Sequence, residues 1–330
     1  MSQDRIASAS DLLRARLDGG LIPAVPVPFH SDGRLHAGAH EAYLRYMAEQ
    51  PIAGVAVWAH TGRGLMLTDE TARLVLQGWR SALPHHVVIA GAGSPAQTLT
   101  PAQATARSID VAERAARYGA DCLLVYAPAW LRGHHNMDAL IVEHHRQLAE
   151  VGLPLILFYL YEAAGGISYS PAVLDELLAM PQVVGIKMVT LNSIMTYQDV
   201  ARHLAARHPE KLLITGEDRF LGYSLRRGGR SALVGMGAVC CRLQAELIDC
   251  HLKGEAARFL ALSDQADFLA EAIFIAPMEG YITRLLWALA HLGVIPEAAA
   301  NDPWGTKLPT SDFVRLARTL DALEQARLSQ

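Results

Sequence analysis

A single lysine interrupts an apolar segment of the sequence. Residues 183–189, VVGIKMV, have the β-branched and apolar composition of a buried β-strand, and Lys187 is their only charged residue. An unpaired ammonium is costly to remove from water, and a buried lysine usually responds with a lowered pKa. A neutral lysine amine attacks ketones and forms Schiff bases. The alternative is a structural lysine at a strand end that reaches solvent or pairs with a carboxylate.

Two other groups of polar residues suit the chemistry of a 2-oxo acid. The turn H-T-G-R-G (60–64) offers backbone N–H groups, a hydroxyl and two potential cations for a carboxylate. A glycine turn with a surface arginine is the alternative. Tyr159 and Tyr161 lie at the end of another apolar segment, and a phenol can shuttle the protons that carbinolamine formation and breakdown require. Each could equally be an ordinary strand tyrosine.

The segments that must position these residues alternate in type along the chain. Eight short segments rich in Val, Ile, Leu or Tyr are predicted to be strands buried on both faces, at residues 21–27, 54–59, 87–91, 122–127, 155–161, 183–189, 212–216 and 232–236. Segments with helical periodicity follow them, at residues 35–49, 68–83, 101–118, 136–151, 170–180, 192–207, 219–227 and 243–252. Eight alternating units predict a (β/α)8 TIM barrel, and an open doubly wound sheet is the structural alternative.

The predicted organisation adds a segment to each end of this barrel. Residues 1–20 form an N-terminal leader, residues 21–253 the barrel and residues 254–330 a C-terminal extension of three helices. A helical extension of this kind covers one side of a barrel or builds a subunit interface.

The composition excludes several classes of protein. The net charge of −4 shows no basic excess, so we expect no nucleic-acid partner, and no apolar segment reaches the 18 residues that would indicate a membrane span. The four cysteines lack zinc spacing, and reduced thiols in a cytoplasmic protein are expected. The adjacent pairs His134–His135 and His144–His145 have no carboxylate at ligand spacing, so no metal site is predicted.

A barrel of this type has its active site at the carboxyl ends of its strands. The polar turn, the tyrosines and the lysine then meet at one mouth, together with Trp130 after the fourth strand and Met236 at the end of the eighth. Strand alternation puts Gly185 and Lys187 on one face, and we expect the glycine to leave space there for a ligand.

Six segments in order along the chain resemble the dihydrodipicolinate synthase / N-acetylneuraminate lyase family, which are class I aldolase-type barrels with a lysine Schiff base. They are A-V-P-V-P-F-H-S-D-G (24–33), A-H-T-G-R-G-L-M-L-T-D-E (59–70), I-A-G-A-G-S (89–94), P-L-I-L-F-Y (154–159), V-V-G-I-K (183–187) and T-G-E-D (215–218). The resemblance covers about residues 20–295. It implies that Lys187 forms the Schiff base, that Thr61 binds the substrate carboxylate, that no external cofactor is needed, and that the protein is a homo-oligomer, a dimer or a tetramer.

The resemblance fails at positions that bear on proton transfer. The family turn G-T-T-G-E becomes A-H-T-G-R, so that His60 replaces a threonine of the tyrosine relay and Arg63 replaces a glutamate. Trp130 stands where the family has a relay tyrosine that reaches the neighbouring subunit, and suggests an apolar or ring-bearing substrate face. His60 is a candidate to take over the acid–base work.

The register of the catalytic tyrosine has two solutions. Alignment from Pro154 puts this tyrosine at Phe158, whereas alignment back from Gly166 puts it at Tyr159 with one residue inserted. We favour Tyr159, because the chemistry needs a phenol, and note that Tyr161 shares its face. The family's arginine for a second carboxylate has no counterpart after this strand.

These observations together predict a Schiff-base lyase, an aldolase or dehydratase that acts on a 2-oxo acid such as pyruvate or a keto-deoxy sugar acid. The alternatives are dihydrodipicolinate synthase itself and a non-catalytic barrel that binds a keto acid or has a structural role. The predicted catalytic residues are Lys187 and Tyr159. The predicted substrate-binding residues are His60, Thr61, Gly62, Arg63, Trp130, Tyr161 and Met236. A role for Glu279, at the start of a C-terminal helix, is left open.

Overall fold

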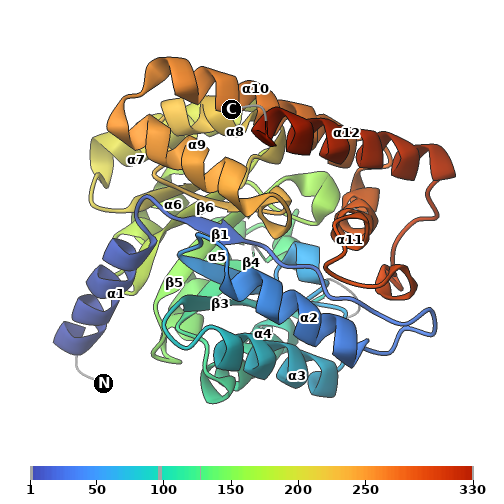
Figure 1. The fold of residues 1–330 in the computed structure, drawn as a ribbon. Coiled ribbons are helices and arrows are strands. Elements are labelled where there is room, and N and C mark those ends of the chain that lie inside the picture. Colours follow the sequence, from blue (N-terminus) through green and yellow to red (C-terminus); the bar gives the residue numbers. More distant parts are fainter. Residues whose placement is uncertain (1–2, 96–98, 127, 329–330) are drawn as a thin grey trace.

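Eight parallel strands form a nearly closed barrel in the computed structural model, which describes residues 3–95, 99–126 and 128–328 (Figure 1). The strands are β1 (Leu21–Pro23), β2 (Gly54–Val57), β3 (Val87–Ala92), β4 (Cys122–Tyr126), β5 (Leu155–Leu160), β6 (Val183–Val189), β7 (Leu212–Thr215) and β8 (Ser231–Val234). Their order is β1-β8-β7-β6-β5-β4-β3-β2, and a parallel bridge between Ala24 and Ala56 joins β1 to β2. The predicted TIM barrel is confirmed.

Helices surround the strands and continue beyond the last one. They are α1 (Gln3–Leu17), α2 (Ala37–Ala48), α3 (Asp69–Ala82), α4 (Pro101–Tyr118), α5 (Met137–Ala149), α6 (Pro171–Leu178), α7 (Ile194–Arg207), α8 (Leu221–Arg226), α9 (Cys241–Lys253), α10 (Ala256–Ile273), α11 (Tyr281–His291) and α12 (Thr310–Leu328). The predicted bounds hold within a few residues. Position 127, the last of the predicted fourth strand, lies outside the described residues, and the division of the chain at residues 20 and 253 stays a prediction.

Local sequence signals explain where several of these helices begin and end. Thr100 caps α4 in a capping box with Gln103, and its hydroxyl accepts the Gln103 N–H. Ser170 caps α6 ahead of a proline at the first helical position. Gly119 ends α4 with φ 97°, a conformation that glycine adopts without a Cβ clash. These signals keep the connections between strands and helices short. Because the strands are parallel, their last residues all lie at the same end of the barrel.

The amino end of the barrel is closed by the helix that precedes it. Leu13 and Leu17 of α1 are buried and pack in one apolar cluster with the inward-facing side chains of the strands. The Ser231 hydroxyl donates a hydrogen bond to the Leu17 carbonyl and ties α1 to the start of β8. Figure 1 shows α1 and α11 on opposite sides of the barrel.

The C-terminal helices cover one flank of the barrel and reach its carboxyl end. Helix α10 packs against α8, α9 and α12, and α11 packs against α12. The fully buried Arg284 of α11 pairs with Asp312 of α12 at 2.7 Å, which fixes the start of α11 over the barrel mouth.

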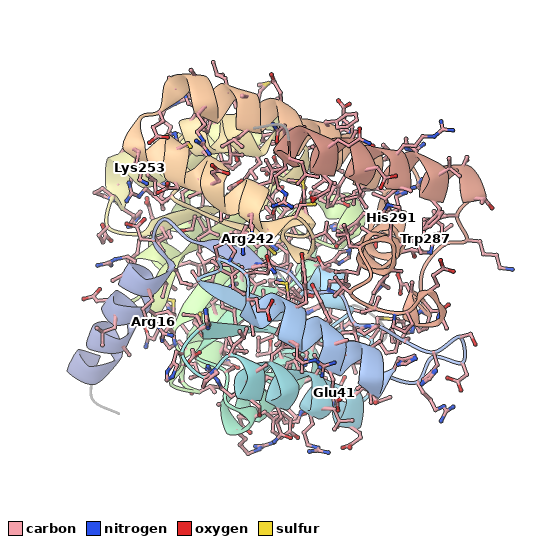
Figure 2. All side chains as sticks on the ribbon, viewed as in Figure 1. Arg16, Glu41, Arg242, Lys253, Trp287 and His291 are labelled. Carbon is pink, nitrogen blue, oxygen red and sulfur yellow. The ribbon has the colours of Figure 1, made fainter. Side chains whose placement is uncertain are left out.

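The outer faces of the helices carry charged side chains (Figure 2) and also exposed apolar ones, such as Leu260 and Phe268 of α10. Among the labelled side chains, Glu41 and Lys253 are exposed. Of the helices that the structure describes, none has the length and apolar character needed to cross a membrane.

Candidate active site

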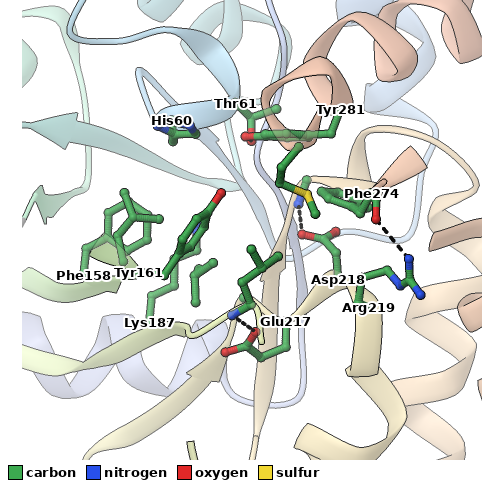
Figure 3. A pocket seen from close by; sticks show the side chains of 16 residues that line it. His60, Thr61, Phe158, Tyr161, Lys187, Glu217, Asp218, Arg219, Phe274 and Tyr281 are labelled. Atoms are coloured by element: carbon green, nitrogen blue, oxygen red, sulfur yellow. Dashed lines mark hydrogen bonds between the residues drawn. The ribbon is translucent and has the colours of Figure 1, made fainter. Parts of the chain in front are cut away.

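A cavity opens at the carboxyl ends of β5, β6, β7 and β8 (Figure 3). Phe158, Tyr161 and Lys187 lie on one side of the cavity, Asp218 and Phe274 lie on the other, and residues of the 60–64 turn and of α11 lie above them. The strands therefore bring residues that are far apart in the sequence to one enclosed space.

Lys187 of β6 lies inside this cavity and is 5% exposed. Its neighbours across the sheet are Phe158 on β5 and Ile214 on β7, and its Nζ lies 4.3 Å from the centre of the Phe158 ring. Burial lowers the pKa of Lys187 to about 8, although the carboxylates of Asp218 and Glu217 oppose the shift. The amine is therefore much closer to its nucleophilic form at neutral pH than an exposed lysine is.

Gly216, rather than Gly185, makes room for this lysine. A Cβ at Gly216 would lie 2.8 Å from Lys187 Cε, so that only glycine fits beside the lysine side chain. A Cβ at Gly185 would lie 2.1 Å from the Leu212 carbonyl oxygen of the neighbouring strand. The expectation that Gly185 leaves space for a ligand is wrong, because this glycine permits the close contact of β6 with β7.

Two acids follow β7, the buried Glu217 and the partly exposed Asp218, and their carboxylates hold neighbouring loops. Both oxygens of Glu217 accept hydrogen bonds, from the Thr190 N–H at 2.6 Å and hydroxyl at 2.8 Å, and from the Leu191 N–H at 3.2 Å. The Asp218 carboxylate accepts the N–H groups of Gly235 at 3.3 Å and Met236 at 2.6 Å. Burial raises the pKa of each acid to about 7, against the effect of these hydrogen bonds. Leu191 has φ 58°, a strained conformation that Glu217 stabilises.

The 60–64 turn meets the start of α11 above the cavity. Thr61 Oγ1 lies 3.1 Å from the Tyr281 hydroxyl, and His60 Nε2 lies 3.1 Å from both carboxylate oxygens of Glu279. Burial tends to raise the pKa of Glu279, but His60 and Arg63 outweigh it and leave the pKa lowered. His60 is therefore held by an ionised carboxylate, an arrangement that orients an imidazole for proton transfer.

Arg63 binds carboxylates of the protein itself. Its guanidinium pairs with Asp302 at 2.7 Å and with Glu279 at 3.2 Å, and its side chain does not line the cavity. The Gly62 N–H donates to the Ala59 carbonyl within the turn, and Gly62 does not line the cavity either. These two members of the predicted substrate-binding set support the turn and do not contact the space above Lys187.

Tyr159 faces away from the cavity. Its hydroxyl lies 3.3 Å from Ser168 Oγ and its ring packs edge-on against Tyr169, on the outer face of β5. We expected Tyr159 to reach a substrate at Lys187, and the strand register corrects this: Phe158 pairs with Lys187, so position 159 points outward. Tyr161, just after the strand, lines the cavity, and burial raises the pKa of its phenol to about 12.

Trp130 and Met236 also lie outside the cavity lining. The Trp130 ring packs edge-on against His144, with ring centres 5.4 Å apart. The Met236 side chain is fully buried, and the residue contributes to the site through its N–H, which Asp218 accepts. The predicted site residues that the structure brings together around the cavity are Lys187, His60, Thr61 and Tyr161.

Sequence reasoning missed the residues that the C-terminal segment contributes. Phe274, Met278 and Tyr281 line the cavity, and no spacing or motif links them to the strands. The segment T-G-E-D (215–218) did carry a signal for Glu217 and Asp218, because two carboxylates directly follow a buried strand at the active end of a barrel.

One group of residues in the described part of the chain has ligand atoms close enough for a metal ion, and it lies outside the cavity. It consists of Asp175, His203 and His208. Both histidine Nε2 atoms and Arg207 Nε already bind the same oxygen of Asp175, at 2.8–3.0 Å. This arrangement neutralises Asp175 without an ion.

The fold and this cavity define a class of protein: a (β/α)8 barrel with a buried lysine on its sixth strand, whose cavity is lined on one side by residues of the C-terminal helical segment. Residues 18–321 match the sequence model of the Dihydrodipicolinate synthetase family, and the chain belongs to this family. The resemblance seen in the six sequence segments is thereby confirmed.

The relatives include both synthases and aldolases. The 4-hydroxy-tetrahydrodipicolinate synthase of Stenotrophomonas maltophilia (strain K279a) is 31% identical over 234 residues, which cover 68% of this chain and 74% of the synthase. The probable mitochondrial 4-hydroxy-2-oxoglutarate aldolase of Emericella nidulans is 25% identical over 261 residues, 76% of this chain and 81% of the aldolase.

A solved structure of the same family has the same fold. YagE from E. coli K12, in complex with pyruvate, superimposes with a TM-score of 0.80 at 19% identity and covers 92% of this chain and 98% of its own. At this identity the likeness establishes the fold.

Proposed function

We propose that this protein is a lyase that forms a Schiff base between Lys187 and a 2-oxo acid such as pyruvate, and that it acts as an aldolase or a dehydratase. The observation that carries the proposal is the Lys187 amine, buried in a cavity with a pKa lowered to about 8. Membership of a family that contains synthases and aldolases supports it.

In the proposed reaction the Lys187 amine attacks the ketone carbon and gives a carbinolamine, which loses water to form an iminium. The iminium accepts the electron pair of a broken C–H or C–C bond at C3 and becomes an enamine. In aldol cleavage the enamine is then protonated at C3, whereas in dehydration it expels the C4 hydroxyl, which takes up a proton and leaves as water. Hydrolysis of the resulting iminium returns the free amine. The substrate carboxylate is placed at Thr61, whose hydroxyl lies beside the Tyr281 hydroxyl.

The proton transfers fall to Tyr161 and His60 in this proposal. Phe158 stands beside Lys187 and has no proton to give, so the phenol of Tyr161 is the nearest replacement on β5 and its following turn. The raised pKa of Tyr161 keeps this phenol protonated at neutral pH. Glu279 orients His60, which can take or deliver a proton at its other ring nitrogen.

Two other functions are separable from this one. The altered turn and the phenylalanine beside Lys187 distinguish this site from that of dihydrodipicolinate synthase as the resemblance describes it. The same phenylalanine is the observation that favours a non-catalytic barrel that binds a keto acid. The expected homo-oligomer, a dimer or a tetramer, belongs to the proposal as well.

Borohydride reduction in the presence of pyruvate tests the proposal. The intact protein is expected to gain the mass of one reduced pyruvate, and Lys187→Ala is expected to gain none. Absence of an adduct with pyruvate and with larger 2-oxo acids would favour the non-catalytic barrel.

A further inference from the structure

One wall of the cavity is apolar above Lys187, on the side of β5 and β6. Val189 is the next inward-facing residue of β6 after Lys187, and Leu160 is the next one of β5 after Phe158. Two residues along a strand advance about 7 Å toward the mouth. Leu191 follows β6 and lines the same wall. A group attached beyond C3 of a 2-oxo acid bound at Lys187 must pass these side chains.

The C-terminal segment supplies an apolar wall on the opposite side. Phe274 is buried and its ring stacks on Tyr281, with ring centres 4.9 Å apart, while Met278 is partly exposed at the mouth. Figure 3 shows Phe274 across the cavity from Phe158 and Tyr161. We call the apolar residues above the lysine the hydrophobic collar, which consists of Leu160, Val189, Leu191, Phe274 and Met278.

The charged side chains that line the cavity beside this collar already have partners. The carboxylates of Glu217 and Asp218 accept backbone N–H groups with both oxygens. Arg219 donates to the Phe274 carbonyl at 3.0 Å and lies 3.8 Å from Glu271. These groups build the walls of the cavity and are not aimed at a ligand.

Three polar side chains of the cavity still have atoms free to bind a ligand, and the proposed reaction of the 2-oxo acid already uses all three. Lys187 Nζ and the Tyr161 hydroxyl have no hydrogen-bond partner among the residues that the structure describes, and His60 is bound through Nε2 alone. A chain of hydroxyl groups beyond C3 that lies against the hydrophobic collar would find apolar side chains there instead of hydrogen-bond partners. A buried hydroxyl left without a partner weakens binding, because its hydrogen bonds to water are lost and not replaced.

We propose that the group beyond C3 of the natural substrate is apolar, an aromatic ring or a branched alkyl chain, so that the aldehyde partner of the reaction is an apolar aldehyde rather than a sugar. This proposal rests on the proposed function and specifies its substrate class. The hydrophobic collar is the specificity-determining surface.

The reaction needs no oxidant or reductant. A 4-hydroxy-2-oxo acid with an apolar group on C4 forms the iminium with Lys187, and a base removes the proton of the C4 hydroxyl. The C3–C4 bond breaks, its electron pair forms the enamine, and the apolar aldehyde leaves. Protonation at C3 and hydrolysis of the iminium then release pyruvate.

A panel of aldehydes tests the proposal in the direction of synthesis. The protein is given pyruvate with benzaldehyde, 2-methylpropanal, erythrose or glyoxylate, and product formation yields kcat/KM for each. We expect kcat/KM for the two apolar aldehydes to exceed that for erythrose and glyoxylate by roughly 100-fold. A preference for erythrose or glyoxylate would overturn the proposal, and the glyoxylate result would point to Arg219 as the partner of a distal carboxylate.

A matched pair of variants assigns the preference to the collar. Met278→Gln keeps the length of the side chain and adds a polar amide to the wall, whereas Met195→Gln makes the same change at an exposed position of α7. We expect Met278→Gln to raise KM for benzaldehyde roughly tenfold while Met195→Gln leaves it unchanged. Equal effects of Met278→Gln on benzaldehyde and erythrose would contradict a role in specificity.

Borohydride trapping with pyruvate alone distinguishes failure of the proposed substrate class from failure of the proposed Schiff-base function. If wild type and Met278→Gln both form the adduct but apolar aldehydes are not preferred, only the substrate class is wrong. If no adduct forms, the Schiff-base function fails and the substrate class fails with it.

Discussion

The two ends of the barrel each contain a lysine with a lowered pKa, in opposite surroundings. At the amino end, Lys211 precedes β7 and donates hydrogen bonds to the carbonyls of Met180 at 3.2 Å and Val183 at 2.8 Å. At the carboxyl end, Lys187 lies against the Phe158 ring and faces a cavity. Burial is the largest cause of the lowered pKa in both.

The comparison shows that a lowered pKa does not by itself define a reactive lysine. The hydrogens of Lys211 are directed at two backbone carbonyls, and α1 packs into that end of the barrel through Leu13 and Leu17. Of these two lysines, Lys187 lines a cavity formed by the described residues, whereas Lys211 does not. We therefore expect Lys187 at the carboxyl end to take part in the chemistry, and residues at the amino end to contribute to stability.

The largest effect is expected from removing the lysine of the carboxyl end. Lys187→Ala should reduce the exchange of pyruvate C3 protons with deuterium oxide, followed by NMR, on the order of 10⁴-fold or more, because the enamine cannot form. Lys211→Ala is the matched control and should exchange at the rate of the wild type. A similar loss in both variants would remove the distinction between the two ends.

Shortening a side chain at the amino end should cost stability. Leu17 is fully buried beneath the barrel strands, so Leu17→Ala is expected to lower the free energy of unfolding by about 2–5 kcal/mol, measured by urea denaturation. The folded fraction should still form the borohydride adduct with pyruvate. Loss of the adduct at concentrations of urea where the variant is folded would show that α1 acts on the site.

Two tyrosines of one segment test which face of β5 is catalytic. Tyr161 lines the cavity and Tyr159 packs on the outer face. Tyr161→Phe is expected to lower kcat about 100-fold through loss of a proton donor, whereas Tyr159→Phe should change it less than about twofold. Steady-state rates of the two variants side by side decide the point, and the reverse order would restore Tyr159 to the mechanism.

The smallest effect concerns pH. Only the neutral amine attacks a ketone, so the rate of adduct formation should rise with pH, pass its midpoint near the Lys187 pKa of about 8 and level off above it. The charges of Asp218 and Glu217 keep this pKa from falling further. Stopped-time borohydride trapping between pH 6 and 10 provides the profile. A midpoint near the ordinary lysine value would mean that the amine is solvated.

The barrel could be predicted from the sequence because the same pattern, a short apolar segment followed by a helical one, occurs eight times. Eight short apolar segments alternate with eight helical ones, and an error in the bounds of one segment does not alter the count. Placing Lys187 required only one such segment and the rule that the active site lies at the carboxyl ends of the strands.

The catalytic tyrosine could not be placed from the sequence, because successive strand residues point to opposite faces. An alignment error of one residue therefore moves the side chain to the wrong face of the sheet. Phe158 and Tyr159 differ by one position, and the pairing of Phe158 with Lys187 is set by the register of β5 on β6. The contact of the C-terminal segment with the 60–64 turn could not be predicted for another reason. Glu279 and Tyr281 contact His60 and Thr61 although more than 200 residues separate them in the sequence, and local sequence patterns do not indicate contacts over such a separation.

Peptide mapping after borohydride reduction with pyruvate tests the difference between the two lysines most directly. Wild-type protein is reduced, digested, and the peptides that contain Lys187 and Lys211 are quantified by mass spectrometry. We expect the reduced pyruvate adduct on Lys187 and an unmodified Lys211. An adduct on both lysines, or on neither, would contradict the claim that the cavity at the carboxyl end creates the reactive amine.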